Sequence, residues 1–344
     1  MTFCGIILCP PSHEIGGGDL IFLEPFQRVS ECIRHKAGVI GGGVRQQCGI
    51  QPQGADMEFT VKFWGVRGTF PCAYASHLTY GGNTSCLEVS VGGRTLILDA
   101  GTGLRALGKR LMRDRIKQAT LLLSHAHWDH INGFPFFEAG YCPDFQMEVV
   151  ARDLTGCECI GDVFTSCMEK PLFPVPLKTM RAELGFHNLH VGDQLDLAPG
   201  LVVKTGDLNH PGGAVGYRIE YGGKAFCYIT DTEHVPGQLD QNILKLIEGA
   251  DVVVYDATYT EAEYATRQGW GHSTWNEGVK LVREAEAKRL CLFHHDPDHD
   301  DHVMAAIERD ARNGFAGAFA AREGVTLDML NLPQVATLAQ RVYA

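Results

Sequence analysis

Strand-like apolar runs begin directly after Met57 and are separated by short polar or glycine-containing segments. The runs "TVKFWGV" (60–66), "SCLEVSV" (85–91) and "RTLILDA" (94–100) predict three strands. A helix-like stretch, "GLRALGKRLMRD" (103–114), then leads to the apolar run "ATLLLS" (119–124). This order predicts hairpins that pass into β-α-β alternation.

A second series of the same kind occupies the later half of the chain. Its predicted strands are 201–208, 214–221, 224–230, 251–258 and 289–295, with a helix at 239–249 and another before the last strand. Because the alternation occurs twice, we expect two sheets packed face to face with helices outside. The predicted fold is therefore an α/β four-layer αββα sandwich.

Residues 1–56 differ from this pattern. They contain "GGG" twice and "QPQG", and they lack sustained helical or strand periodicity. We expect 1–56 to be a loosely ordered extension that is dispensable for activity and stability, and 57–344 to form the structured domain.

Composition narrows the class of protein. The chain has 344 residues, 45% hydrophobic and 21% charged, which suffices for one large domain or two small ones. No apolar run approaches the roughly 20 residues of a membrane helix, so we expect no membrane span. The N-terminal apolar patch has no Lys or Arg before it, which disfavours a secretory signal peptide. Twelve scattered cysteines favour a reducing cytoplasm over a disulfide framework.

The formal net charge of −11 bears on partners. Binding a long nucleic acid requires many lysines and arginines against its phosphates, and the sequence shows no basic stripe. A small-molecule substrate, held by local positive charge such as metal ions, fits this balance better than a polymer.

The candidate chemistry is concentrated in "SHAHWDHINGFPFF" (124–137), directly after an apolar run. Residues two apart on a helix face away from each other, so His125 and His127 would share a metal only from an extended segment or tight loop. Asp129 and His130 follow, where they could serve a second metal. Spacing of this kind, H-x-H-x-D-H, indicates a metal site; the alternative is a histidine-rich surface loop.

Further ligands are expected at other strand ends. His210 lies between two predicted strands, Asp231 ends one, and His294 or His295 ends the last. A single His or Asp in such a place is usually a solvated turn residue, so only their order and setting favour a metal role.

Taken together, these motifs resemble the metallo-β-lactamase superfamily, over Met57 to about Asp310. Asp99 in "LILDAGTG" matches the aspartate that precedes the histidine motif and supports it without binding metal. The segments "FWGVRGT", "YGGNTSCLEV" and "GWGHSTWNEGVKL" are most similar to the branch of ribonuclease Z and related phosphodiesterases.

The resemblance implies a site with two divalent metal ions. His125, His127 and His210 would hold one ion, Asp129, His130 and the final histidine the other, and Asp231 would bridge them. His294 is the expected last ligand and His295 the alternative. Zinc suits this set of imidazoles and carboxylates best, although manganese or iron also fits the residue types.

Catalytic roles are implied for Asp129 and His272. His272 in "GWGHST" would protonate the leaving group, and Thr274 to Glu277 would form a capping box at the start of the next helix. The alternative is an ordinary exposed histidine. Asn83, Thr84 and Ser85 would contact the substrate phosphate, unless this loop is a hairpin turn without a ligand.

A pair of divalent ions about 3.5–4 Å apart can provide hydroxide near neutral pH. Ribonuclease Z carries a tRNA-binding arm between the ligands that correspond to His210 and Asp231, but only 21 positions separate these two residues here. We therefore expect a small phosphodiester, such as a cyclic nucleotide. Hydrolysis of a lactone, thioester or β-lactam and a non-catalytic ligand sensor are the alternatives. Whether the chain forms a homodimer stays open.

Overall fold

The strands expected from the apolar runs gather into two seven-stranded sheets in the computed structural model, which describes residues 57–153 and 159–333. The predicted extension 1–56 lies outside the described residues. All described residues belong to one unit, Gln53–Ala344.

The first sheet has the order β14-β1-β2-β3-β4-β5-β6. Its members are β1 (Phe59–Gly65), β2 (Cys86–Val91), β3 (Arg94–Leu98), β4 (Gln118–Leu122), β5 (Gln146–Arg152), β6 (Glu183–Leu189) and β14 (Thr326–Asp328). Strands β14, β1, β2 and β3 pair antiparallel, whereas β3 through β6 pair parallel.

The second sheet has the order β13-β12-β11-β10-β9-β8-β7. It contains β7 (Gln194–Ala198), β8 (Leu201–Leu208), β9 (Ala214–Tyr221), β10 (Lys224–Ile229), β11 (Val252–Asp256), β12 (Leu290–Phe293) and β13 (Ala318–Ala320). Strands β7 to β10 are antiparallel and β10 to β13 are parallel.

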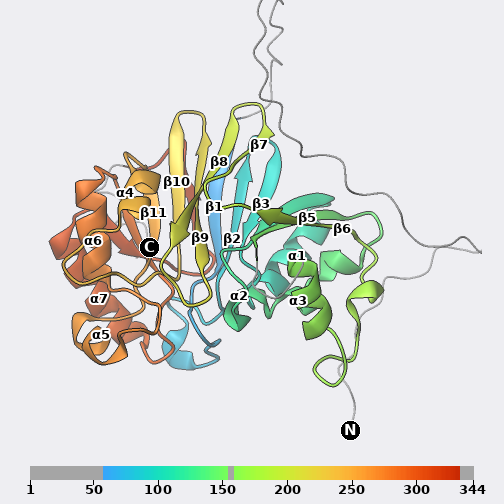
Figure 1. Ribbon diagram of the computed structural model, residues 1–344, viewed down its shortest axis with the longest axis horizontal. Helices are drawn as coiled ribbons and strands as arrows, with labels where there is room; N and C mark the ends of the chain where they lie inside the picture. Colours follow the sequence, from blue (N-terminus) through green and yellow to red (C-terminus); the bar gives the residue numbers. More distant parts are fainter. Residues whose placement is uncertain (1–56, 154–158, 334–344) are drawn as a thin grey trace, which may run out of the picture. The chain divides into compact units, whose positions relative to one another are not determined.

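Helices cover the outer face of each sheet (Figure 1). The first sheet packs with α1 (Leu104–Arg113), α2 (Trp128–Ile131) and α3 (Ile160–Cys167), together with the 3₁₀ turns η2 (Phe134–Phe136) and η3 (Glu138–Tyr141). The second sheet packs with α4 (Gln241–Ile247), α6 (Trp275–Glu284) and α7 (Asp301–Gly314). The short helix α5 (Glu261–Arg267) precedes α6 in the chain. Two further 3₁₀ turns are η1 (Ala75–His77) and η4 (Leu177–Thr179). None of the described helices combines the length and apolarity needed to cross a membrane.

Three separate apolar layers explain this order. The layer between the sheets takes alternate residues of both, such as Phe63 from β1 and Phe293 from β12. A second layer joins the first sheet to its helices and includes Leu107, and a third joins the other sheet to its helices and includes Met304. An element with one apolar face must bury that face, and two sheets with helices outside satisfy every face. The predicted αββα sandwich is confirmed.

The tail of the domain contributes more than its sequence suggested. β13 and β14 follow α7 and supply one edge strand to each sheet, although each has only three residues. The expected capping box at α6 is half formed. Thr274 Oγ1 accepts from the Glu277 amide at 3.3 Å, but the Glu277 carboxylate contacts Lys280 rather than turning back to the cap.

The parallel strands bring candidate side chains to common sheet edges. In the first sheet, β3 and β4 end just before Asp99 and His125; in the second, β10 and β12 end just before Asp231 and His294. Because parallel strands finish at the same edge, residues remote in sequence meet there.

Candidate metal centre

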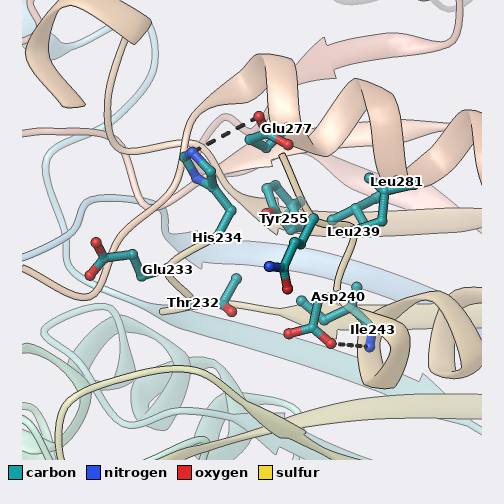
Figure 2. Close-up of a pocket in the computed structure, with 10 residues that line it drawn as sticks. Thr232, Glu233, His234, Leu239, Asp240, Ile243, Tyr255, Glu277 and Leu281 are labelled. Atoms are coloured by element: carbon teal, nitrogen blue, oxygen red, sulfur yellow. Dashed lines mark hydrogen bonds and ion pairs between the residues drawn. The ribbon is translucent and has the colours of Figure 1, made fainter. Parts of the chain in front are cut away.

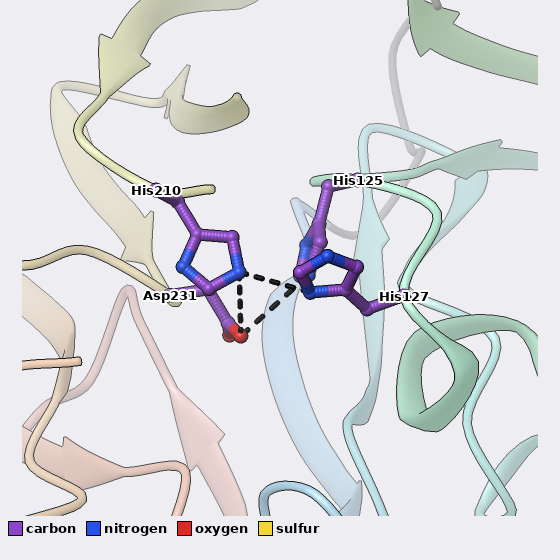
Figure 3. Close-up of side chains that lie close together, drawn as sticks. All are labelled: His125, His127, His210 and Asp231. Atoms are coloured by element: carbon purple, nitrogen blue, oxygen red, sulfur yellow. Dashed lines mark hydrogen bonds and ion pairs between the residues drawn. The ribbon is translucent and has the colours of Figure 1, made fainter. Parts of the chain in front are cut away.

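His125, His127, His210 and Asp231 converge on one point between the two sheets (Figure 3). His125 follows β4, His127 precedes α2, His210 lies between β8 and β9, and Asp231 follows β10. One ligand atom from each lies within 4.8 Å of the others. His210 Nε2 is 3.0 Å from His127 Nδ1, and Asp231 Oδ2 is 3.6 Å from His125 Nε2.

Asp129, His130 and His294 form a second group beside the first. Asp129 Oδ2 lies 3.3 Å from His130 Nε2 and 3.2 Å from His294 Nε2. Asp231 joins the groups, because its Oδ1 lies 3.2 Å from His130 Nε2 while Oδ2 faces the first group. The seven side chains named from the sequence are thus brought together. His295 points elsewhere and donates from Nε2 to the Ala321 carbonyl at 2.9 Å.

Asp99 supports this centre from behind. Its Oδ2 accepts from His130 Nδ1 at 2.7 Å and from the Tyr228 hydroxyl at 2.8 Å, and its Oδ1 accepts from the Ser124 amide at 2.7 Å. The bond to Nδ1 leaves His130 Nε2 as the nitrogen that faces the cluster. Ser124 Oγ lies 3.0 Å from His125 Nδ1 and fixes that ring in the same way.

Two other imidazoles are held through Nδ1. His294 Nδ1 lies 3.0 Å from Thr258 Oγ1, which is itself 2.6 Å from Asp256 Oδ1. His210 Nδ1 donates to the Gly271 carbonyl at 2.7 Å. Each ring therefore presents Nε2 to the cluster, which is the arrangement expected of metal-binding histidines with outer partners.

The cluster fits divalent cations on its own chemistry. His125 Nε2 is buried and has no hydrogen-bond partner. His130 Nε2 and His294 Nε2 lie 3.3 Å apart beside the Asp129 carboxylate, and both Nδ1 atoms are bonded elsewhere. Such an arrangement calls for positive charge between the rings, and imidazole nitrogen with carboxylate oxygen is the donor set that zinc prefers.

Protonation in the cluster follows the same electrostatics. Burial lowers the pKa of His125 well below its ordinary value, and neighbouring histidines add to this. Burial also opposes charge on His130, yet Asp231, Asp129 and Asp99 raise its pKa well above the usual value. Burial would raise the pKa of Asp129, but His130 and His294 hold it far below the ordinary range.

Three supporting or cluster residues adopt a left-handed backbone directly after a strand. Asp99, Asp231 and His294 have φ values of 61°, 55° and 60°. This conformation is uncommon for residues other than glycine and costs roughly 1–2 kcal/mol each. This backbone turn directs each side chain toward the neighbouring sheet. The free-energy cost of the left-handed backbone is therefore part of forming the site.

His272 lies against the cluster, on the loop between α5 and α6. Its Nδ1 is 2.9 Å from Asp256 Oδ2 and 3.9 Å from Asp231 Oδ2, and its ring stacks on His294 with centroids 4.8 Å apart. Burial alone would lower the pKa of His272, but Asp256 outweighs it and raises the pKa to about 9. Asp256 was missed from the sequence; its signal was an aspartate at the end of an apolar strand, the feature that identified Asp231.

Asn83, Thr84 and Ser85 have internal partners. The Asn83 side chain donates to Glu323 at 3.0 Å, and Thr84 Oγ1 accepts from the Thr102 amide at 2.8 Å. Thr84 and Ser85 are fully buried. These bonds give the loop a structural role, and its contact with substrate stays a prediction.

A small recess is formed by the residues that follow Asp231 together with parts of α4, β11 and α6 (Figure 2). It is lined by Thr232, Glu233, His234, Gln238, Leu239, Asp240, Ile243, Tyr255, Glu277 and Leu281. None of the seven candidate metal ligands lines it, so the recess is separate from the space between the two groups.

Comparison with known proteins shows where this architecture recurs. Ribonuclease Z from Parabacteroides distasonis is 29% identical over 106 residues, which are 31% of this chain and 33% of that protein. The chain therefore spans about a third of the length of that curated relative.

Solved structures resemble the fold over a longer range. YhfI from Bacillus subtilis, a metallo-beta-lactamase fold protein, has a TM-score of 0.61 at 19% identity and covers 79% of this chain and 100% of its own. A diphosphatase from the PhnP family has a TM-score of 0.59 at 18% identity and covers 78% of this chain and 97% of its own.

The family model of the beta-lactamase superfamily domain matches residues 94–295. This range is more than half of the chain and includes every residue of the two clustered groups. Since fold, clustered donors and family model agree, this chain belongs to the beta-lactamase superfamily.

Proposed function

We propose that this protein is a metal-dependent hydrolase of phosphodiesters, with a small molecule such as a cyclic nucleotide as its substrate. The observation that carries the proposal is the convergence of seven His and Asp side chains from both sheets into two groups joined by Asp231. The names of the relatives, a ribonuclease Z and a diphosphatase, support chemistry at phosphate rather than at carbon.

The residues divide between two cation sites. His125, His127 and His210 would hold one ion and Asp129, His130 and His294 the other, with Asp231 shared, and zinc is the ion we propose. When bound, such a pair supplies a nucleophilic water of lowered pKa and positive charge for the phosphate oxygens. Asp129 Oδ2 also accepts a hydrogen bond from the Thr69 amide at 2.7 Å, which helps to fix the orientation of this carboxylate.

His272 is proposed to protonate the leaving oxygen. Asp256 holds its Nδ1 at 2.9 Å, so the proton that can be delivered is on Nε2. The imidazole is further confined by its stacking on His294 and an edge contact with Tyr259. A donor with one nitrogen anchored needs little reorganisation to act as general acid.

A small substrate is favoured over tRNA by the segment between His210 and Asp231. Strands β9 and β10 fill it and are joined only by Gly222 and Gly223. The net charge of −11 also disfavours a long polyanion. A cytoplasmic location, inferred from the scattered cysteines, is part of the same proposal.

The test is hydrolysis by purified protein loaded with zinc or manganese. We expect turnover of bis-p-nitrophenyl phosphate and of at least one cyclic nucleotide, loss of turnover after chelation, and recovery on adding metal. Asp231→Asn should abolish it, whereas Glu261→Gln, which removes a nearby exposed carboxylate, should not. Turnover of a lactone or nitrocefin without any phosphodiester would contradict the proposal, as would a metal-loaded protein that hydrolyses none of them.

A further inference from the structure

Glu233 is a carboxylate near the centre that accepts three hydrogen bonds and has no part in the proposed mechanism. Its Oε1 accepts from the Gly269 amide at 2.6 Å, and its Oε2 accepts from the Gly271 amide at 2.8 Å. The Tyr264 hydroxyl lies 3.1 Å from Oε1. In Figure 2 the Glu233 side chain points away from His234 and Glu277.

Gly271 is hydrogen-bonded both to Glu233 and to the candidate metal ligand His210. Its amide is held by Glu233, and its carbonyl accepts from His210 Nδ1 at 2.7 Å. A Cβ on Gly271 would lie 2.5 Å from His210 Nδ1, and φ here is +87°. Only glycine permits this approach, so the Gly271 peptide forms a direct link between the Glu233 carboxylate and the His210 ring.

The backbone of Glu233 is fixed to the same histidine loop. The Glu233 amide donates to the Asn209 carbonyl at 2.7 Å, and Asn209 Nδ2 donates to the Glu233 carbonyl at 2.7 Å. Glu233 also follows Asp231 by two residues and contacts the loop that leads to His272. It therefore connects the three loops that carry His210, Asp231 and His272.

We propose that Glu233 is a positioning residue, which orients the His210 imidazole and the approach of His272 by holding the amides of Gly269 and Gly271. A carboxylate suits this role because each of its oxygens accepts a hydrogen bond from a backbone amide. In an amide side chain, an NH2 group would replace one oxygen and would face a backbone N–H without being able to accept from it. The proposal deepens the proposed function, and its zinc-binding and kinetic parts rest on that function.

Glu233→Gln tests the proposal while keeping the side chain's size. In metal-free protein, we expect faster hydrogen exchange at Gly269 and Gly271 and a shifted ¹⁵N signal of His210 Nδ1. Zinc affinity, measured by chelator competition, should fall roughly 10-fold or more, the range seen when outer partners of metal ligands are lost. At saturating zinc, kcat should fall more than KM changes.

Glu261→Gln is the matched control, because its carboxylate accepts from Thr274 Oγ1 at 2.6 Å and not from the glycine amides. It should leave exchange, the His210 signal and zinc affinity at wild-type values. Glu233→Asp keeps the carboxylate and should recover part of the zinc affinity; it also replaces Glu233→Gln if that variant does not fold.

Wild-type exchange, His210 signal and zinc affinity in Glu233→Gln would overturn the positioning role. Equal losses in Glu261→Gln would also overturn it, because the effect would then follow charge and not the bonds to glycine. If wild-type protein hydrolyses no phosphodiester, the proposed function fails, but the metal-free measurements still decide the role of Glu233.

Discussion

His130, His210 and His294 each have Nδ1 bonded to a different kind of acceptor: a carboxylate, a backbone carbonyl and a hydroxyl. The result is nevertheless the same, since every ring turns Nε2 toward the cluster. Outer contacts of this kind fix tautomer and orientation before any cation arrives. At the scale of the residue, the site is thus prepared by bonds to residues that would not themselves bind metal.

His272 gives the sharpest prediction at this scale. Replacing it with Ala removes the proposed proton donor while leaving the seven candidate ligands in place, so kcat on a phosphodiester should fall roughly 100-fold. Metal content, measured by elemental analysis, should match wild type. Tyr74→Phe, a change at an exposed aromatic residue, serves as the control. Wild-type turnover in His272→Ala would remove this residue from the mechanism.

The sequence could predict the candidate ligands because spacing and strand ends carried the signal. His125, His127, Asp129 and His130 are adjacent in the chain, and Asp231 directly follows an apolar strand. The choice between His294 and His295 depended on the turn after β12, where His294 is left-handed and His295 turns away to Ala321. That turn has no signature in the residue types alone.

Supporting residues were harder to predict, for a physical reason. Glu233 and Asp256 act through hydrogen bonds to a loop, to Thr258 and to His272, and these partners are set by packing rather than by spacing in the sequence. Asn83 and Thr84 likewise have partners that the sequence did not indicate, Glu323 and Thr102, and the phosphate contact expected of this loop stays a prediction.

At the scale of the element, α2 is short but tightly placed. It has only four residues, Trp128–Ile131, and two of them, Asp129 and His130, face the cluster. Its position is set by the turn after β3, since the Ala100 amide donates to the His130 carbonyl at 2.7 Å and the Gly133 amide donates to the Ala100 carbonyl at 2.9 Å.

Gly133→Ala should therefore disturb the site through the helix. The added Cβ would lie 2.0 Å from the Gly101 carbonyl oxygen, so α2 must shift or the turn must open. We expect a loss of about 1–3 kcal/mol in the free energy of unfolding, typical of overpacking, together with weaker zinc binding. Denaturant unfolding and metal competition measure both.

Gly314→Ala is the control for this prediction, because a Cβ there meets its nearest neighbour, Trp275, at an ordinary 3.6 Å. It should change neither quantity appreciably. Wild-type stability and zinc binding in Gly133→Ala would show that the turn after β3 does not determine the position of α2.

Elements with long apolar runs were predictable, and the shortest ones were not. β11 and β12 are buried at every position, and their runs of consecutive apolar residues are typical of inner parallel strands. β13 and β14 have three residues each, too few for a period to show. They form because the neighbouring strands have unpaired edges. Those edges exist only in the assembled fold, so the sequence of the short segment does not predict them.

At the scale of the whole molecule, Glu308 links parts of the chain that are far apart. It is fully buried on α7 and accepts from Arg322 Nη2 at 2.7 Å, the Tyr80 hydroxyl at 2.9 Å and the Ala320 amide at 3.1 Å. Burial opposes ionisation, but Arg322 outweighs it and lowers the pKa of Glu308 below its ordinary 4.5.

This pKa predicts an acid-dependent contribution to stability. Because ionised Glu308 is favoured in the folded state, its contribution is complete above the ordinary pKa of 4.5 and is lost as pH falls through the lower folded value. Glu308→Gln should cost about 3–5 kcal/mol at neutral pH, since it leaves Arg322 without its carboxylate. The difference from wild type should shrink in acid.

Denaturant unfolding across the pH range checks this prediction. Glu284→Gln, at an exposed position on α6, should stay within about 0.5 kcal/mol of wild type throughout. A gap between Glu308→Gln and wild type that is constant from neutral to acid pH would show that the carboxylate's charge plays no part.

The division of the centre between two sheets also has a consequence for biosynthesis. His130 and His294 face each other across 164 positions of sequence. When His125 to His130 have been translated, β12 has not yet been made, so the nascent chain contains only part of the set of candidate metal ligands. The complete set of seven candidate donors therefore exists only after β12 and His294 have been translated.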